Sequence, residues 1–174
     1  KADSLPRRSA QTALYHVTEA MARWIAPVLS FTAEEIWDVL PAPVASEREE
    51  SVLLAEWYEG FPVLSETGFD EAYWRTLMDV KEAVNGVLEQ ARNEKRIGAS
   101  LGAEVTLYAA DELKASLDRL GNELRFVLIT SAATVLPLDA ESGEATELKG
   151  LRVSVAASEA EKCERCWHHS ETVG

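Results

Sequence analysis

Two long stretches of this chain place apolar residues on one face of a helix, and this repeat limits the fold more than any other feature. In the first stretch the apolar residues recur every three or four positions, at Leu14, Val17, Met21, Trp24, Ile25 and Val28. The second stretch repeats the spacing at Leu77, Val80, Val84, Val87, Leu88 and Ala91. Both patterns have the period of an α-helix and predict two long amphipathic helices.

A short helix is predicted between the two long ones. Pro27 ends or kinks the first long helix, because proline removes a backbone donor. Thr32 and Glu35 have the spacing of a capping box, with Phe31 and Ile36 placed as a hydrophobic staple. The short helix is expected to end at Pro41 and to bury Ala33, Ile36, Trp37 and Leu40. Tryptophans 24, 37, 57 and 74 lie on or near apolar faces, so we expect them in the core.

The second long helix is expected to run from Glu71 to Arg96, with Asp70 as its cap. Together the three helices predict a bundle whose first members lie upstream of Lys1. A bundle that lacks members would expose an apolar face and favour self-association.

The pattern changes at Gly98 from helical to mixed. Apolar and polar residues alternate over residues 104–108 and 151–155, which predicts two strands. Residues 126–130 and 134–138 are rich in β-forming residues. Asp111 is placed to cap a short helix, and residues 51–57 are expected to be extended. The predicted fold class is therefore α+β. Its expected parts are a helical domain at 1–97, a small α+β unit at 98–158 and the start of a metal-binding knuckle at 159–174.

The chain has two cysteines, Cys163 and Cys166, in a C-x-x-C arrangement near its end. Structural zinc sites usually take four Cys or His ligands, so this pair is half of such a site. A redox C-x-x-C is the alternative, but it normally opens a helix after a strand, whereas this pair follows an acidic segment. His168 or His169 is a candidate third ligand, although surface positions suit both better.

Both ends of the chain lead us to expect that it is a piece of a larger protein. The sequence begins Lys-Ala-Asp, and eight residues follow Cys166. We therefore expect the remaining metal ligands to lie beyond these residues. Two cysteines without a disulfide framework favour a reducing cytoplasm, and no apolar run is long enough to cross a membrane.

The net charge of −13 argues against a protein that binds DNA or RNA over its whole surface. Residues 32–75 hold eleven acidic residues against two arginines, so RNA would bind only a local face. Candidate contacts are Arg92, Lys95 and Arg96, whose spacing puts them on one face of a helix end. Cations there also complement the helix dipole, which is the simpler interpretation.

Two further residues are candidates for RNA contact. Arg23 lies four residues after Glu19 and is equally suited to a surface ion pair. Trp167, directly after the cysteine pair, is placed either to pack on the knuckle or to stack on a base. We find no catalytic constellation and no phosphate-binding glycine loop in the sequence.

These motifs resemble a known family. Residues 23–37 (Arg-Trp-Ile-Ala-Pro-Val-Leu-Ser-Phe-Thr-Ala-Glu-Glu-Ile-Trp) are similar to the helical anticodon-binding domain of class I aminoacyl-tRNA synthetases for branched aliphatic amino acids. Residues 95–101 (Lys-Arg-Ile-Gly-Ala-Ser-Leu), the strand at 103–108 and residues 162–168 (Lys-Cys-Glu-Arg-Cys-Trp-His) resemble the bacterial isoleucyl-tRNA synthetases. Residues 31–37 alone leave valyl and leucyl enzymes open, and the C-x-x-C-W ending favours isoleucyl.

The resemblance implies a cytoplasmic enzyme that activates isoleucine with ATP and Mg²⁺ and attaches it to isoleucine tRNA. Its catalytic and editing domains would lie upstream, so this segment alone would be inactive and would partner with the rest of the synthetase chain. The family's knuckle has four cysteines, of which Cys163 and Cys166 carry over as zinc ligands. Two other functions stay open from the residues alone: an acidic helical protein-interaction module and a redox module.

Overall fold

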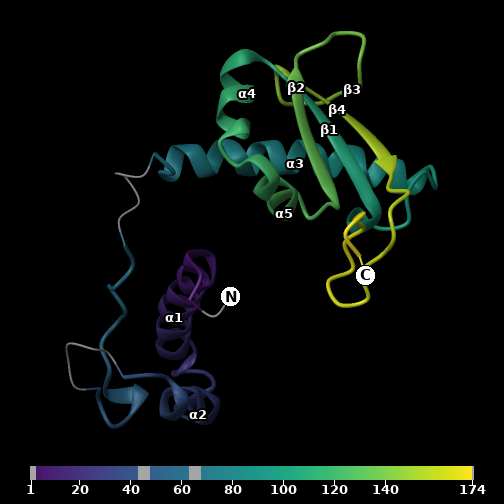
Figure 1. The fold of residues 1–174 in the computed structure, drawn as a ribbon. Coiled ribbons are helices and arrows are strands. Elements are labelled where there is room, and N and C mark those ends of the chain that lie inside the picture. Colours follow the sequence, from purple (N-terminus) through teal and green to yellow (C-terminus); the bar gives the residue numbers. More distant parts are fainter. Residues whose placement is uncertain (1–2, 43–47, 63–67, 174) are drawn as a thin grey trace. The chain divides into compact units, whose positions relative to one another are not determined.

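The computed structural model describes residues 3–42, 48–62 and 68–173, so Lys1 and part of the expected acidic loop lie outside the described residues. The chain divides into two compact units, residues 1–63 and residues 64–174. Figure 1 shows helices α1 and α2 in the first unit and a sheet with three helices in the second. Each unit is described by itself.

The first unit is built on helices α1 (Leu5–Ile25) and α2 (Ser30–Val39), followed by a 3₁₀ turn at Val52–Leu54. Its small core consists of Ala22, Ala26, Ala33, Trp37 and Val52. Alanines at the contact let the two helix backbones approach closely, and the large Trp37 ring fills the space beneath them. The helix boundaries near Pro27 and Pro41 agree with the predicted ones.

The apolar face of α1 is largely exposed. This face, named here the α1 apolar face, comprises Leu14, Val17, Met21, Trp24 and Val28. Met21 is 50% exposed, whereas the buried positions of α1 are Glu19, Ala20 and Ala22. The prediction that Trp24 and Trp57 belong to the core is therefore wrong for this chain, while Trp37 is buried as expected. The reason is that α1 packs on α2 through its alanines and not through its large side chains.

Helix α2 begins two residues before the predicted cap. Ser30 is already helical, Leu29 is the N-cap residue, and no side chain caps the helix, so the capping box is wrong. Phe31 is 89% exposed, which rules out the staple. The Ser30 hydroxyl donates instead to the Ala26 carbonyl at 2.9 Å and links α2 to the end of α1. The extended segment expected at 51–57 contains the 3₁₀ turn, capped by the Ser51 hydroxyl, which accepts from Leu53 N.

In the second unit, helix α3 (Glu71–Asn93) confirms the predicted cap and apolar face. The Asp70 carboxylate accepts a hydrogen bond from Tyr73 N at 2.9 Å. All six residues of the predicted face are buried: Leu77, Val80, Val84, Val87, Leu88 and Ala91. The helix ends three residues before Arg96, because Lys95 adopts a left-handed conformation with φ of 61°.

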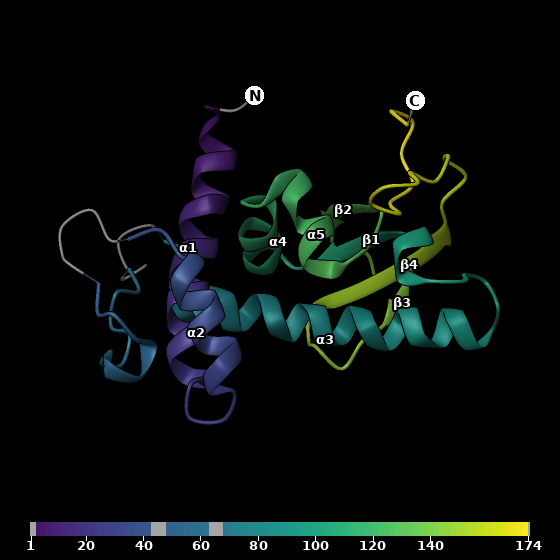
Figure 2. The ribbon, with the colours of Figure 1, turned by 90° about the horizontal axis from the view of Figure 1, so that it is seen from below.

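The sheet has the order β2-β1-β4-β3, formed by β1 (Ala103–Ala109), β2 (Ala132–Pro137), β3 (Glu144–Ala145) and β4 (Leu151–Ala157). Strand β2 pairs with β1 in parallel, and β4 pairs antiparallel with both β1 and β3. Alternate residues of β1 and β4 are buried, and helices α3, α4 (Asp111–Asp118) and α5 (Leu124–Leu128) contribute to the same core. The helices therefore cover one face of the sheet, and Figure 2 shows α3 lying along it.

Strands β1, β2 and β4 confirm the predicted strands, but two predictions fail between β1 and β2. Residues 124–128 form helix α5, although 126–130 is rich in β-forming residues. Parallel strands need a crossover, and here α4 and α5 supply it. Asp111 is the first residue of α4 and does not cap it, since the N-cap residue is Ala110.

The compact units divide the chain at a different place from the expected domains. Helix α3 shares one core with the sheet, whereas the sequence groups it with the helices before it. The domain limits at 97/98 and 158/159 remain a prediction. Among the residues that the structure describes, no helix is long and apolar enough to span a membrane.

Candidate nucleic-acid interface and metal half-site

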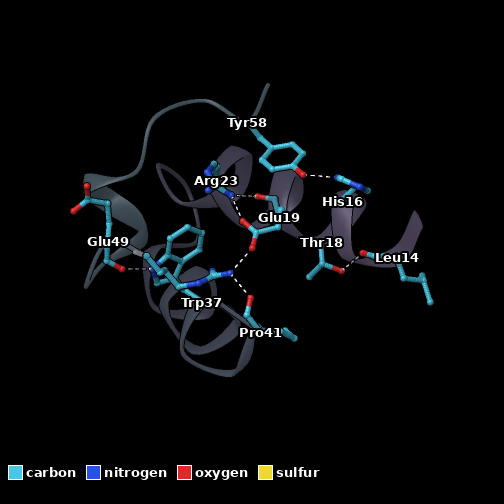
Figure 3. A network of polar contacts seen from close by, with 10 residues as sticks. Leu14, His16, Thr18, Glu19, Arg23, Trp37, Pro41, Glu49 and Tyr58 are labelled. Atoms are coloured by element: carbon cyan, nitrogen blue, oxygen red, sulfur yellow. Dashed lines mark hydrogen bonds and ion pairs between the residues drawn. The ribbon is translucent and has the colours of Figure 1, made fainter. Parts of the chain in front are cut away.

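Glu19 is the centre of a charged network in the first unit (Figure 3). Its side chain is 1% exposed and accepts from Arg23 Nη1 at 2.5 Å and from Arg48 Nη2. Arg23 Nη1 also donates to the Glu19 carbonyl at 2.8 Å. Burial opposes ionisation of Glu19, but hydrogen bonds from Arg23, Arg48 and Tyr15 outweigh it, so the Glu19 pKa is lowered. One ionised carboxylate thus serves two arginines.

Both arginines of this network stack on Trp37. The guanidinium carbons of Arg23 and Arg48 lie 4.6 Å and 4.2 Å from the ring centroid. Trp37 Nε1 donates to the Glu49 carbonyl at 2.8 Å, and the Glu49 carboxylate points away from the network in Figure 3. The predicted Arg23–Glu19 pair exists, but it is buried where the sequence suggested a surface pair. Removing one partner of the pair would leave the other charge buried, and this destabilises a protein more than the loss of a surface pair does.

Arg92, Lys95 and Arg96 do not share a helical face, which corrects the expected arrangement. Arg92 lies in the last turn of α3 and pairs with Glu89 at 2.7 Å on the surface. Lys95 lies past the helix end and has no ion pair with any described residue. Arg96 pairs with Glu94 at 2.7 Å and Glu144 at 2.8 Å, and donates to the Val155 carbonyl at 3.3 Å. Arg96 therefore ties the end of α3 to the sheet.

The charges around Arg96 reinforce this link. Hydrogen bonds from Gln90 and then from Arg96 lower the Glu94 pKa, and the Glu94 carboxylate raises the Arg96 pKa more than any other group does. Of the three cations, Lys95 is the one whose charge is least compensated by neighbours within the described residues.

Cys163 and Cys166 lie on a tight hairpin turn. Cys163 N donates to the His168 carbonyl and Trp167 N donates to the Cys163 carbonyl, both at 2.9 Å. Lys162 and His169 form an antiparallel bridge that closes the hairpin. Trp167 has a φ of 66°, a conformation that the tight turn requires at this position. The cysteines are not joined in a disulfide.

The hairpin favours a thiolate at Cys163. The backbone N–H groups of Cys166 and then Arg165 point toward the Cys163 sulfur and lower its pKa. A thiolate with N–H donors directed at it is the form that binds zinc. The donor chemistry of this turn therefore fits half of a zinc site.

Neither histidine completes a metal site. His168 Nδ1 lies 3.2 Å from the Cys166 carbonyl, and its ring packs edge-on against Phe126. His169 Nδ1 lies 2.8 Å from the Ala160 carbonyl. Within the described part of the chain, no group of three or more His, Cys, Asp or Glu residues is arranged to hold a metal.

Trp167 presents an aromatic surface beside the cation of Lys162. Its side chain is 60% exposed, and Lys162 Nζ lies 5.0 Å from its ring centroid. Arg165 lies on the same turn. The sequence analysis did not single out Lys162 or Arg165 as candidates for RNA contact, although both lie within or next to the cysteine pair. It also missed Arg48, whose partner Glu19 is 29 residues away and left no local pattern.

Residues 1–107 match the family model described as the anticodon-binding domain of tRNA ligase. This match covers more than half of the chain, which therefore belongs to that family. The chain is also 56% identical to an isoleucine–tRNA ligase of Shewanella amazonensis and 57% identical to one of Stutzerimonas stutzeri. The alignments cover 100% and 99% of this chain, and it spans 18% of the length of each of these relatives.

Proposed function

We propose that this chain is the anticodon-binding part of an isoleucine–tRNA ligase and that its partner is isoleucine tRNA. The observation that carries the proposal is the identity of 56% with an isoleucine–tRNA ligase over the whole chain, which includes the cysteine hairpin. Isoleucine, ATP and Mg²⁺ would be handled by parts of the ligase outside these residues. A cytoplasmic location agrees with the free cysteines.

The RNA-contacting groups are proposed to lie in the second unit. We propose that Lys95 and Arg92 contact phosphates. Both are exposed, and Lys95 has no ion pair with any described residue. Trp167 offers a ring on which an unpaired base can stack, with Lys162 beside it for the backbone and Arg165 on the same turn. Arg96 and Arg23 form ion pairs with carboxylates, so we propose that each mainly stabilises the unit in which it lies.

Cys163 and Cys166 are proposed as two ligands of a structural zinc ion, with further ligands supplied from outside these residues. Zinc would cross-link the hairpin to the segment that carries those ligands. The chain's own contribution is the turn itself, which brings two thiols together and directs backbone donors at Cys163.

The α1 apolar face is the proposed contact with the rest of the ligase. Its large side chains are exposed in this chain, and the relatives are more than five times longer. Upstream helices that covered Leu14, Val17, Met21 and Trp24 would complete the bundle. In the isolated chain the same face favours self-association, which sedimentation at increasing concentration detects.

The function is tested by binding of isoleucine tRNA and of a non-cognate tRNA across a salt series. We expect tighter binding of the cognate tRNA, and affinity for both that falls as salt rises, because phosphate contacts release counterions. The matched variants are Lys95→Ala and Lys149→Ala, the second at an exposed lysine in the turn before β4. Only Lys95→Ala should reduce the dependence of affinity on salt. Weak and equal affinities for the two tRNAs would contradict anticodon readout within these residues and would leave them mainly as a scaffold.

A further inference from the structure

A buried hydroxyl joins the knuckle to the sheet of the second unit. Ser131, between α5 and β2, is 2% exposed. Its Oγ donates to the Leu101 carbonyl and accepts from His169 N at 2.6 Å. Its own backbone N–H donates to the Ala103 carbonyl at 2.9 Å. Ser131 therefore holds the start of β1 with one bond of its side chain and the knuckle with the other.

The remaining hydrogen bonds of the knuckle are local. His168 and Trp167 bond to Cys163, Ser170 N donates to the Glu161 carbonyl at 3.0 Å, and His169 Nδ1 bonds to the Ala160 carbonyl. Among the described residues, the bond from His169 N to Ser131 is the one hydrogen bond that connects residues 159–173 to residues before 158. The ring contact between His168 and Phe126 is a second, weaker link.

The backbone around Ser131 fixes where its hydroxyl points. Helix α5 ends at Leu128, and its C-cap residue Ile129 is left-handed with a φ of 58°. Thr130 N then donates to the Arg125 carbonyl at 3.0 Å, and the fully buried Thr130 side chain bonds to the Ala132 carbonyl at 3.1 Å. A residue held this firmly can set the orientation of a segment whose other hydrogen bond to the rest of the unit is the one from Ala160 N to Ser158 Oγ, directly after β4. A hydroxyl is needed because it donates and accepts at once.

We propose that Ser131 is a positioning residue that sets the orientation of the knuckle on the sheet and so directs Trp167 toward RNA. The inference rests on the proposed function, since it assumes that the knuckle contacts tRNA. Cys163 and Cys166 are not touched by Ser131, so the metal is held by the hairpin whether or not the hairpin is docked.

The test compares Ser131→Ala, Trp167→Ala and the double variant in the full-length ligase that carries these residues. Ser131→Ala removes the partner of the half-buried His169 N–H and Leu101 carbonyl, so we expect about a 10-fold loss of affinity for isoleucine tRNA. Cobalt substituted for zinc should keep its thiolate absorption band. The double variant should bind no more weakly than Trp167→Ala, because both changes act through the same ring. The control is Ser116→Ala, a half-buried serine on α4 whose hydroxyl donates to the Glu112 carbonyl, and this variant should bind tRNA normally.

Additive losses from the two variants, or normal affinity in Ser131→Ala, would overturn the inference. Residue-resolved hydrogen exchange of the unaltered ligase gives a second test that does not depend on the folding of a variant. The His169 amide should exchange as slowly as the amides of β1, and exchange as fast as that of the chain end contradicts docking. If the unaltered ligase shows no preference for isoleucine tRNA while His169 is protected, the proposed function fails and the docking stands.

Discussion

Helices α1 and α3 have the same apolar spacing and opposite surroundings. The apolar face of α3 is buried against the sheet, from Leu77 to Ala91. The α1 apolar face is exposed, and the contact between α1 and α2 is made by alanines and by the Glu19 network. The spacing of apolar residues therefore identifies the face of a helix that needs a partner. Whether the partner is present in the same chain depends on residues far from the helix.

The two helices also differ in how their stability is obtained. Each Leu or Val of α3 removed from water contributes about 1.5–3 kcal/mol. Helix α1 buries a carboxylate between two guanidiniums, an arrangement that stabilises little relative to an apolar contact but is strongly destabilising when one partner is lost. A change in either helix should thus act through a different mechanism.

The largest effect is expected from a charge placed on the buried face of α3. Val80→Asp puts a carboxylate into a site that is fully buried, and we expect a loss of more than about 4 kcal/mol in the free energy of unfolding. Val17→Asp is the matched change on the α1 apolar face and should alter the stability of this chain by less than about 0.5 kcal/mol. Denaturant unfolding of the 174-residue chain measures both. Similar losses would show that the α1 face is buried here.

The same Val17→Asp change should become severe when the rest of the ligase is present. If upstream helices cover the α1 apolar face, the carboxylate is buried and the loss in the full-length protein rises to about 2–4 kcal/mol. The difference between the two proteins, measured by denaturant unfolding, is the useful quantity. An unchanged small effect would mean that the face stays exposed and would remove the proposed docking surface.

Loss of the Glu19 charge should destabilise the first unit by about 3–5 kcal/mol in Glu19→Gln, because the largely buried guanidiniums of Arg23 and Arg48 lose their counter-charge. The control is Glu71→Gln, whose pair with Arg75 is exposed and should contribute close to nothing. Equal effects in the two variants would contradict the buried network.

The network also makes the first unit sensitive to acid. The Glu19 pKa is lower in the folded chain than in the unfolded chain, so its stabilising contribution is present above the unfolded pKa of about 4.3. The contribution is lost as pH falls through the folded pKa. Unfolding measured from pH 7 down to pH 3 should show this loss in the unaltered chain and a smaller one in Glu19→Gln.

The helix caps provide the smallest contrast. Asp70→Ala removes the bond to Tyr73 N and should destabilise the second unit by about 1 kcal/mol. Ser4→Ala, at the matching position of α1, should have no effect, because the Ser4 side chain makes no capping bond. Thermal unfolding resolves the difference, and a measurable effect of Ser4→Ala would indicate a cap that forms in solution.

Local patterns predicted those parts of the fold that short-range chemistry decides. The Asp70 cap, the buried face of α3 and strands β1, β2 and β4 all follow from neighbouring residues. Helix α5 was missed because the crossover between parallel strands overrides the β-forming residues of that segment. The exposure of Trp24 was missed because the sequence does not say which part of the chain covers α1.

The candidate site divides in the same way. The cysteine pair and the Arg23–Glu19 pair are close in sequence and were predicted, although the burial of that ion pair was not. Arg92, Lys95 and Arg96 do not share a helical face because one residue, Lys95, adopts a left-handed conformation. Arg48 and Ser131 contact groups 29 and 38 positions away, and no spacing rule connects such residues.

The most direct test of anticodon recognition is a comparison of two tRNAs on two ligases. Isoleucine tRNA with its own anticodon and with a replaced anticodon would be bound to the full-length ligase and to its Trp167→Ala variant at one salt concentration. We expect the replaced anticodon to weaken binding to the unaltered ligase by about 1–3 kcal/mol, the magnitude of one lost base-edge contact, and less in the variant, in which no ring holds the base whose edge is read. An anticodon effect of the same size in both ligases would contradict contact between this knuckle and the anticodon.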